Sequence, residues 1–102
     1  MIAEISVVPV GSGESLSRYV AEAIKVIENS GNRYELSSMG TIVEVQNYLE
    51  LGELLENINN VLISMGVKRV YIVVKTDFRV EGGSIEQKKI SVIEKLEESG
   101  KS

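Results

Sequence analysis

The residues that could do chemistry in this chain gather in one short segment, Tyr34–Glu44. It reads as a strand, a tight polar turn and a second strand. Ser37, Ser38 and Thr41 offer hydroxyl groups there, and Glu44 offers a carboxylate. Such groups bind small polar ligands through hydrogen bonds and charge. Because no catalytic motif stands elsewhere in the chain, this hairpin is the first place to look for a ligand site.

The composition excludes several kinds of site. The chain has no cysteine and no histidine, which rules out Ser-His and Cys-His catalytic pairs, thiolate metal sites and a disulfide framework. A metal ion would need carboxylates alone. Only carboxylates, lysine, tyrosine and serine remain for acid–base chemistry, and their positions show no pairing. We therefore expect a protein that is not an enzyme, with no catalytic residues, no metal site and no cofactor.

Charge and hydropathy narrow the choice of partners. The formal net charge of -4 argues against nucleic acid, whose phosphates need a basic surface. No apolar run approaches the roughly 20 residues of a membrane span. The first ten residues lack a basic region and include Glu4, so we expect no signal peptide. The absence of cysteine fits a cytoplasmic protein, and the 102 residues fit a single domain covering residues 1–102.

The elements that must position the hairpin follow from hydrophobic periodicity. Strands are expected at residues 2–8, 33–37, 40–46 and 69–76, and helices at 15–29, 49–65 and 84–98. Pro9 should close the first strand, because proline lacks the N–H that a strand ladder needs. Ser12 or Ser15 could cap the first helix, and Asn47 with Glu50 resembles a capping box for the second.

The order of these elements predicts an α+β fold of the ferredoxin-like βαββαβ type with an additional C-terminal helix. Right-handed crossovers then place two helices on one face of an antiparallel four-stranded sheet with strand order 4-1-3-2. This topology should bring the end of the first strand (Val8, Pro9), the Ser37–Thr41 turn and the start of the last strand to one edge. The N-terminus of the first helix, which attracts anions, is expected there too.

The sheet face opposite the two helices is expected to be half apolar. Its residues are Glu4, Ser6, Val8, Tyr71, Val73 and Lys75. Such a face rarely stays bare in water. The C-terminal helix or another subunit could cover it. We favour a sheet-to-sheet dimer, with the last helix tying subunits together.

Several short motifs occur in a recognisable order. The first strand ends in Pro-x-Gly at Pro9, and Ser17–Val20 reads Ser-x-Tyr-Val. Residues 34–44 read Tyr-Glu-x-x-x-Met-Gly-Thr-x-x-Glu, and the last strand opens with Arg-Val-Tyr at Arg69–Tyr71. Over about residues 2–97 the chain resembles the small thiamine-binding, YkoF-like proteins. The resemblance implies a ferredoxin-like fold, dimers that pair into tetramers, and binding of thiamine or its hydroxymethylpyrimidine part, as a carrier or sensor without established catalysis.

Four of the candidate ligand-binding residues are polar side chains of the hairpin. Ser37, Ser38 and Thr41 could hydrogen-bond an aminopyrimidine edge, or they could only build the turn. Glu44 could pair with a thiazolium cation or an amine, or it could be an ordinary strand charge paired across the sheet. Both readings are open for each residue.

The other three candidates are Ser6, Tyr34 and Met39. Ser6 could be a pocket wall or a dimer contact. Tyr34 could stack on a ring, or pack in the core or an interface with its hydroxyl in water. Met39 could pack on a flat ligand or plug the turn. If none of these residues binds a ligand, the alternative function is a structural or regulatory homo-oligomer in which the hairpin builds only an interface.

Overall fold

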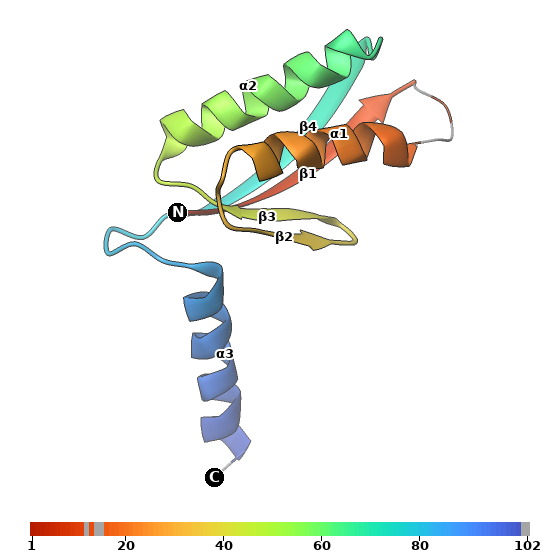
Figure 1. Cartoon of the computed structure of the whole chain (residues 1–102). Coiled ribbons are helices and arrows are strands. Elements are labelled where there is room, and N and C mark those ends of the chain that lie inside the picture. Colours follow the sequence, from red (N-terminus) through yellow and green to blue (C-terminus); the bar gives the residue numbers. More distant parts are fainter. Residues whose placement is uncertain (12, 14–15, 101–102) are drawn as a thin grey trace.

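The structure, a computed structural model, describes residues 1–11, 13 and 16–100. The elements are β1 (Ile2–Val10), α1 (Leu16–Asn29), β2 (Tyr34–Ser37), β3 (Gly40–Glu44), α2 (Tyr48–Ser64), β4 (Arg69–Asp77) and α3 (Ile85–Gly100). The four strands form one antiparallel sheet with the order β2-β3-β1-β4. Read from the other edge, this is the predicted order 4-1-3-2. The ferredoxin-like α+β fold with an additional C-terminal helix is therefore confirmed (Figure 1).

The core lies between the sheet and the helices α1 and α2. Ala3 and Ile5 of β1 are buried on this inner face, and they meet Ile27 of α1 and Ile58 and Leu62 of α2. The period of two in β1 and of three to four in the helices explains this arrangement, because each pattern turns its apolar residues toward one side. The predicted assignment of strand faces is confirmed for these residues.

The strand β1 is longer than expected, because Pro9 does not end it. The strand pairs with β4 as far as Val10. Met1, just before β1, and Val45, just after β3, exchange two backbone hydrogen bonds of 2.9 Å. Because the direction of the backbone groups alternates along a strand, the odd-numbered residues of β1 also turn their N–H and C=O toward β3. Pro9 is one of these residues, but β3 does not extend that far. Proline at position 9 therefore costs the sheet no hydrogen bond. The prediction that Pro9 ends the first strand was wrong.

One of the two hydrogen bonds predicted for the N-terminal cap of α2 is present. The Asn47 side chain accepts a hydrogen bond of 2.9 Å from the backbone N–H of Glu50. In a full capping box, Glu50 would reach back to the Asn47 N–H. It accepts instead from the N–H of Gln46 at 2.9 Å. The predicted caps of α1, Ser12 and Ser15, lie outside the described residues.

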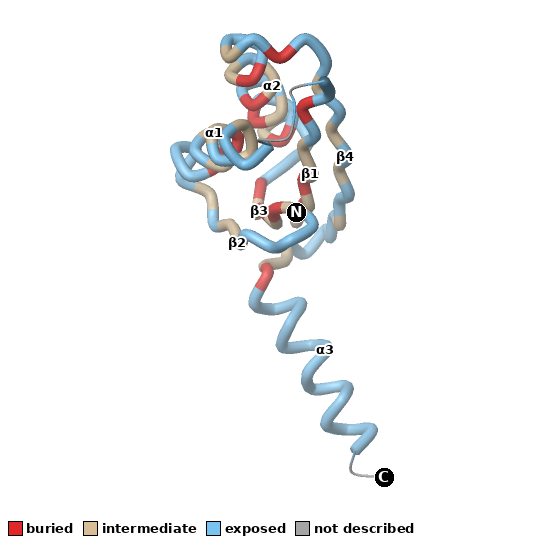
Figure 2. The backbone as a smooth tube through the Cα atoms, turned by 90° about the vertical axis from the view of Figure 1, so that its right-hand side faces the viewer, coloured by how far each residue is buried: buried red, intermediate tan, exposed pale blue. Residues whose placement is uncertain are grey.

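The outer face of the sheet and the helix α3 are both largely uncovered. On the outer face, Tyr71 is 55% exposed and Val73 is 42% exposed. The helix α3 projects away from the domain (Figures 1 and 2), and Ile85 is its only buried residue. Beyond this first turn, Val92, Ile93 and other apolar side chains of α3 remain exposed. Within one subunit, α3 therefore does not cover the outer face.

Candidate functional site

A hollow of about 150 Å³ lies where the hairpin turn meets β1 and α1, and we call it the hairpin hollow. The turn contributes Ser37–Thr41, and β1 contributes Ile5–Val7. One side of the hollow is an apolar wall from α1, formed by Val20, Ala23, Ile24 and Ile27. Residues that carry hydroxyl groups and an apolar wall thus line the same small space, a combination found in ligand sites.

Five of the seven candidate residues line this hollow: Ser6, Ser37, Ser38, Met39 and Thr41. Thr41 is buried with 4% of its surface exposed, whereas Met39 is 81% exposed at the tip of the turn. The Ser37 hydroxyl donates a hydrogen bond of 2.8 Å to the Gly40 carbonyl oxygen, so it also stabilises the turn. The hairpin turn therefore brings four of the candidates to one place beside Ser6 of β1, although the four differ widely in exposure.

The position of the turn along the sheet differs from the expected one. Thr41 lies opposite Ile5, four residues before Pro9. The reason is length, because β3 has five residues and β1 has nine. The hairpin therefore ends halfway along β1, beside the middle of α1. The expectation that it lies beside Pro9 and the start of β4 was wrong.

Gly40 is a residue of the hollow to which the sequence assigned no role. Its φ is not positive, so the turn does not need glycine for its backbone conformation. A Cβ atom at this position would lie 3.1 Å from the Ile5 carbonyl oxygen and 3.3 Å from the Cγ of Glu4. A side chain at this position would be crowded because β1 passes so close to the end of the hairpin, and its neighbours would have to shift by a few tenths of an ångström. Only the Met-Gly-Thr motif could have signalled this in the sequence.

Tyr34 and Glu44, the other two candidates, do not line the hairpin hollow. The Tyr34 hydroxyl donates a hydrogen bond of 3.1 Å to a carboxylate oxygen of Glu28 in α1. This bond raises the pKa of Tyr34 above its usual value. A carboxylate oxygen of Glu44 accepts a hydrogen bond of 2.8 Å from the backbone N–H of Ile85. Both side chains therefore connect elements of the domain.

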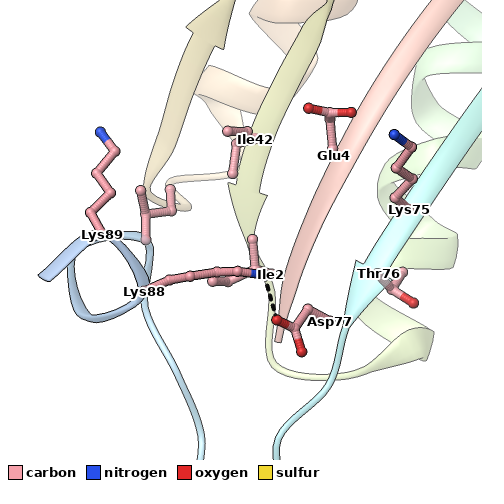
Figure 3. Close-up of a pocket in the computed structure, with 9 residues that line it drawn as sticks. Ile2, Glu4, Ile42, Lys75, Thr76, Asp77, Lys88 and Lys89 are labelled. Carbon is pink, nitrogen blue, oxygen red and sulfur yellow. Dashed lines mark hydrogen bonds and ion pairs between the residues drawn. The ribbon is translucent and has the colours of Figure 1, made fainter. Parts of the chain in front are cut away.

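A larger pocket of about 330 Å³ lies between the outer sheet face and the base of α3, and we call it the outer-face pocket (Figure 3). Its apolar part comes from Ile2, Ile42 and Ile85. Charged side chains surround this part: Glu4, Lys75, Asp77, Lys88 and Lys89. Glu4 and Lys75 were expected on this face from the strand pattern, and the C-terminal helix was one of the two covers considered for it; in the structure only the base of α3 contributes to the pocket.

Two consecutive lysines of α3 reach opposite edges of the sheet at this pocket. Lys88 lies 2.6 Å from a carboxylate oxygen of Asp77 on β4, and Lys89 lies 2.8 Å from one of Glu35 on β2. These lysines hold the pKa values of Asp77 and Glu35 below their usual range. The base of α3 is therefore fixed across the width of the sheet.

A further ion pair holds the first turn of α3. The guanidinium group of Arg33 lies 2.7 Å from a carboxylate oxygen of Glu86. The pKa of Glu86 is lowered by a hydrogen bond from its own backbone N–H and by Arg33, and the pKa of Arg33 is raised by Glu86. These groups are exposed to water, where single ion pairs stabilise weakly. Their effect is therefore to orient α3.

No group of three or more histidine, cysteine, aspartate or glutamate side chains that could hold a metal ion is found among the described residues. Within the same part of the chain, no helix is both long and apolar enough to cross a membrane.

Comparison with known proteins gives consistent matches over most of the chain. Residues 3–94 match the model of a family described as thiamine-binding protein. A UPF0045 protein of Methanothermobacter thermautotrophicus is 36% identical over 96 residues, which cover 92% of this chain and 97% of that protein. A UPF0045 protein of Methanocaldococcus jannaschii is 31% identical over 98 residues, covering 94% of each chain.

Solved structures show the same fold. The crystal structure of the hypothetical protein MJ1052 from M. jannaschii has a TM-score of 0.79 and 30% identity, covering 89% of this chain and 93% of that one. A Thermotoga maritima protein provisionally named for thiamine biosynthesis or salvage has a TM-score of 0.75 and 26% identity, covering 85% of this chain and 91% of that one.

Proposed function

Because this chain belongs to the thiamine-binding protein family, we propose that it binds thiamine or its hydroxymethylpyrimidine part and catalyses no reaction. The observation that carries this proposal is the hairpin hollow, which five of the seven residues chosen from the sequence line together. As a binder without catalysis, the protein would serve as a carrier or sensor in the cytoplasm.

The size of the hollow supports the pyrimidine part as the group that enters it. Pockets for drug-sized ligands measure roughly 300–1,000 Å³, and the hairpin hollow measures about 150 Å³. It has room for one small ring, and the remainder of a larger ligand would extend past the turn. The apolar wall from α1 supports a ring face, and the exposed side chain of Met39 is free to close over it.

In this proposal the seven candidate residues have two kinds of role. Ser6, Ser37, Ser38, Met39 and Thr41 contact the ligand, because all five line the hollow. Tyr34 and Glu44, which bind Glu28 and the N-terminus of α3, support the frame around the hairpin.

Calorimetric titration of the purified protein with thiamine, and separately with hydroxymethylpyrimidine, tests the proposal. We expect heat of binding and a rise in the melting temperature with both ligands, because any ligand that binds only the folded state stabilises it. If millimolar concentrations of either compound give neither heat nor a thermal shift, the proposal is wrong.

A structural or regulatory homo-oligomer is the second candidate function. It is favoured by the exposed outer face and by the exposed apolar side chains of α3, because surfaces of this kind mark protein interfaces. Pairing of outer faces would give a dimer, and α3 would join two dimers into a tetramer.

A double variant, Ser37→Ala with Thr41→Val, separates the two candidates. If the hollow binds the ligand, affinity falls while sedimentation of the protein is unchanged. If the variant dissociates the assembly and leaves ligand affinity intact, the hairpin serves the interface and the second candidate is favoured.

A further inference from the structure

The backbone of Val7 presents an unpaired strand edge inside the hairpin hollow. The two hydrogen bonds between Met1 and Val45 set the alternation of β1, and Val7 is among the residues that face β3. The pairing with β3 nevertheless ends at Ile5. Among the described residues, none hydrogen-bonds to the Val7 backbone on this side. Its N–H and C=O point into the space that a longer β3 would fill.

That space is the hairpin hollow, since Val7 lines it together with Ser6, Ser38 and Met39. The side chain of Val7 packs against the core on the inner face, so its peptide groups are held in position. Backbone N–H and C=O groups that water does not satisfy require a partner. A strand residue facing such an edge would exchange two hydrogen bonds with it, so the edge offers one donor beside one acceptor.

We infer that this edge recognises the aminopyrimidine ring of the ligand, an inference that rests on the proposed function. The ring has a nitrogen acceptor next to an amino donor, the complement of the Val7 N–H and C=O. The same pattern of neighbouring acceptor and donor on adenine is bound in a bidentate manner by the amide of asparagine or glutamine. The ring therefore occupies the place of the absent β3 residue, with one face toward Val20 and Ile24 of α1.

This assignment defines the class of ligand more closely than the family name does. Recognition requires a flat ring with an amino group next to a ring nitrogen, and it does not require the thiazolium cation. Thiamine and hydroxymethylpyrimidine should therefore both bind. A hydroxymethylpyrimidine analogue that lacks the amino group should bind about tenfold more weakly, since it leaves the Val7 carbonyl without its partner.

The test compares Val7→Pro with Val7→Ala in the full chain. Both variants remove the branched valine side chain, but only proline removes the N–H. Since this N–H makes no bond to β4, proline breaks no sheet bond at this position, and Pro9 occupies an equivalent position two residues later. We expect Val7→Pro to bind hydroxymethylpyrimidine about tenfold more weakly than Val7→Ala. The control Pro9→Ala should bind like the wild type.

Amide NMR of the wild type gives a second readout that does not depend on folding of the proline variant. Titration with hydroxymethylpyrimidine should shift the Val7 amide signal, and the analogue without the amino group should shift it less. The inference is overturned if hairpin amides shift while Val7 does not, or if the folded proline and alanine variants bind equally. A third result would also overturn it: without ligand, the Val7 amide becomes more protected from hydrogen exchange as the protein concentration rises. A strand of a second copy would then occupy the edge. Absence of any binding by the wild type would instead be a failure of the proposed function.

Discussion

Glu44 accepts a hydrogen bond of 2.8 Å from the backbone N–H of Ile85, and this bond joins the end of the hairpin to the first turn of α3. A carboxylate at a helix N-terminus satisfies a free N–H and interacts favourably with the helix dipole. We predict that Glu44→Ala lowers the free energy of unfolding by about 1 kcal/mol and speeds amide hydrogen exchange in α3. Glu44→Gln is the matched control, because its side-chain oxygen can still accept the bond. If both variants leave exchange in α3 unchanged, the contact does not hold the helix.

Acid should release the base of α3. The pKa values of Glu35, Asp77 and Glu86 are lowered in the folded state. A carboxyl group whose pKa is lowered by folding contributes its full stabilisation at pH values above its ordinary pKa. This stabilisation is lost as the pH falls through the lowered pKa of the folded state. The ordinary values are 4.5 for the two glutamates and 3.8 for Asp77. We predict that proteolysis within residues 78–84 accelerates as the pH falls below this range.

The control for this pH effect is a double variant, Lys88→Met with Lys89→Met. It removes two of the ion pairs at every pH, so proteolysis should be faster at neutral pH and should change less on acidification. Equal pH dependence in the variant and the wild type would assign the effect to other groups.

Gly40→Ala should destabilise the protein because of crowding. The added Cβ would approach the Ile5 carbonyl oxygen to 3.1 Å, and overpacking of this kind costs about 1–3 kcal/mol. Gly52→Ala in α2 is the matched control, because nothing lies within 4 Å of a Cβ there. Alanine should stabilise that helix by up to about 1 kcal/mol. Denaturant unfolding measures both changes, and a neutral Gly40→Ala would show that β1 and the hairpin can separate at no cost.

The fold was predictable from the sequence because its periodic patterns are local. The period of two in β1 and β4 and the apolar stripes of α1 and α2 determine which side chains meet in the core. Pro9 was misjudged because its effect depends on where another strand ends, which no local pattern records. The same holds for Gly40, where a side chain would be crowded only because β1 approaches the hairpin so closely.

The candidate site was predictable only in part. The polar residues of the turn were found because their types and positions are unusual, and they do line one hollow. The contacts of Glu44 with Ile85 and of Lys89 with Glu35 join residues more than 40 positions apart. Such pairs depend on the direction in which α3 leaves the sheet, and the sequence of the loop before it does not specify that direction.

The exposed outer face should mediate self-association. Tyr71 and Val73 lie exposed on the part of this face that the edge strand β4 forms, and burial of such side chains against another copy would stabilise an assembly. We predict that Val73→Lys shifts the protein toward smaller species in analytical ultracentrifugation. Asn60→Lys, at an exposed position of α2 on the opposite side of the sheet, should leave the distribution unchanged. A wild type that is monomeric at all accessible concentrations would contradict the prediction.

Ser38 and Tyr34, both selected from the sequence, should differ in their effect on ligand binding. Ser38 lines the hairpin hollow, whereas the Tyr34 hydroxyl is bonded to Glu28. A hydrogen bond between a serine hydroxyl and a neutral ligand contributes about 0.5–1.5 kcal/mol, so we predict that Ser38→Ala weakens binding of hydroxymethylpyrimidine by about two- to tenfold. Tyr34→Phe removes one hydroxyl outside the hollow and should leave the affinity unchanged while slightly reducing stability. Titration calorimetry of both variants measures the difference, and the reverse result would move the site from the hollow toward the other end of the hairpin.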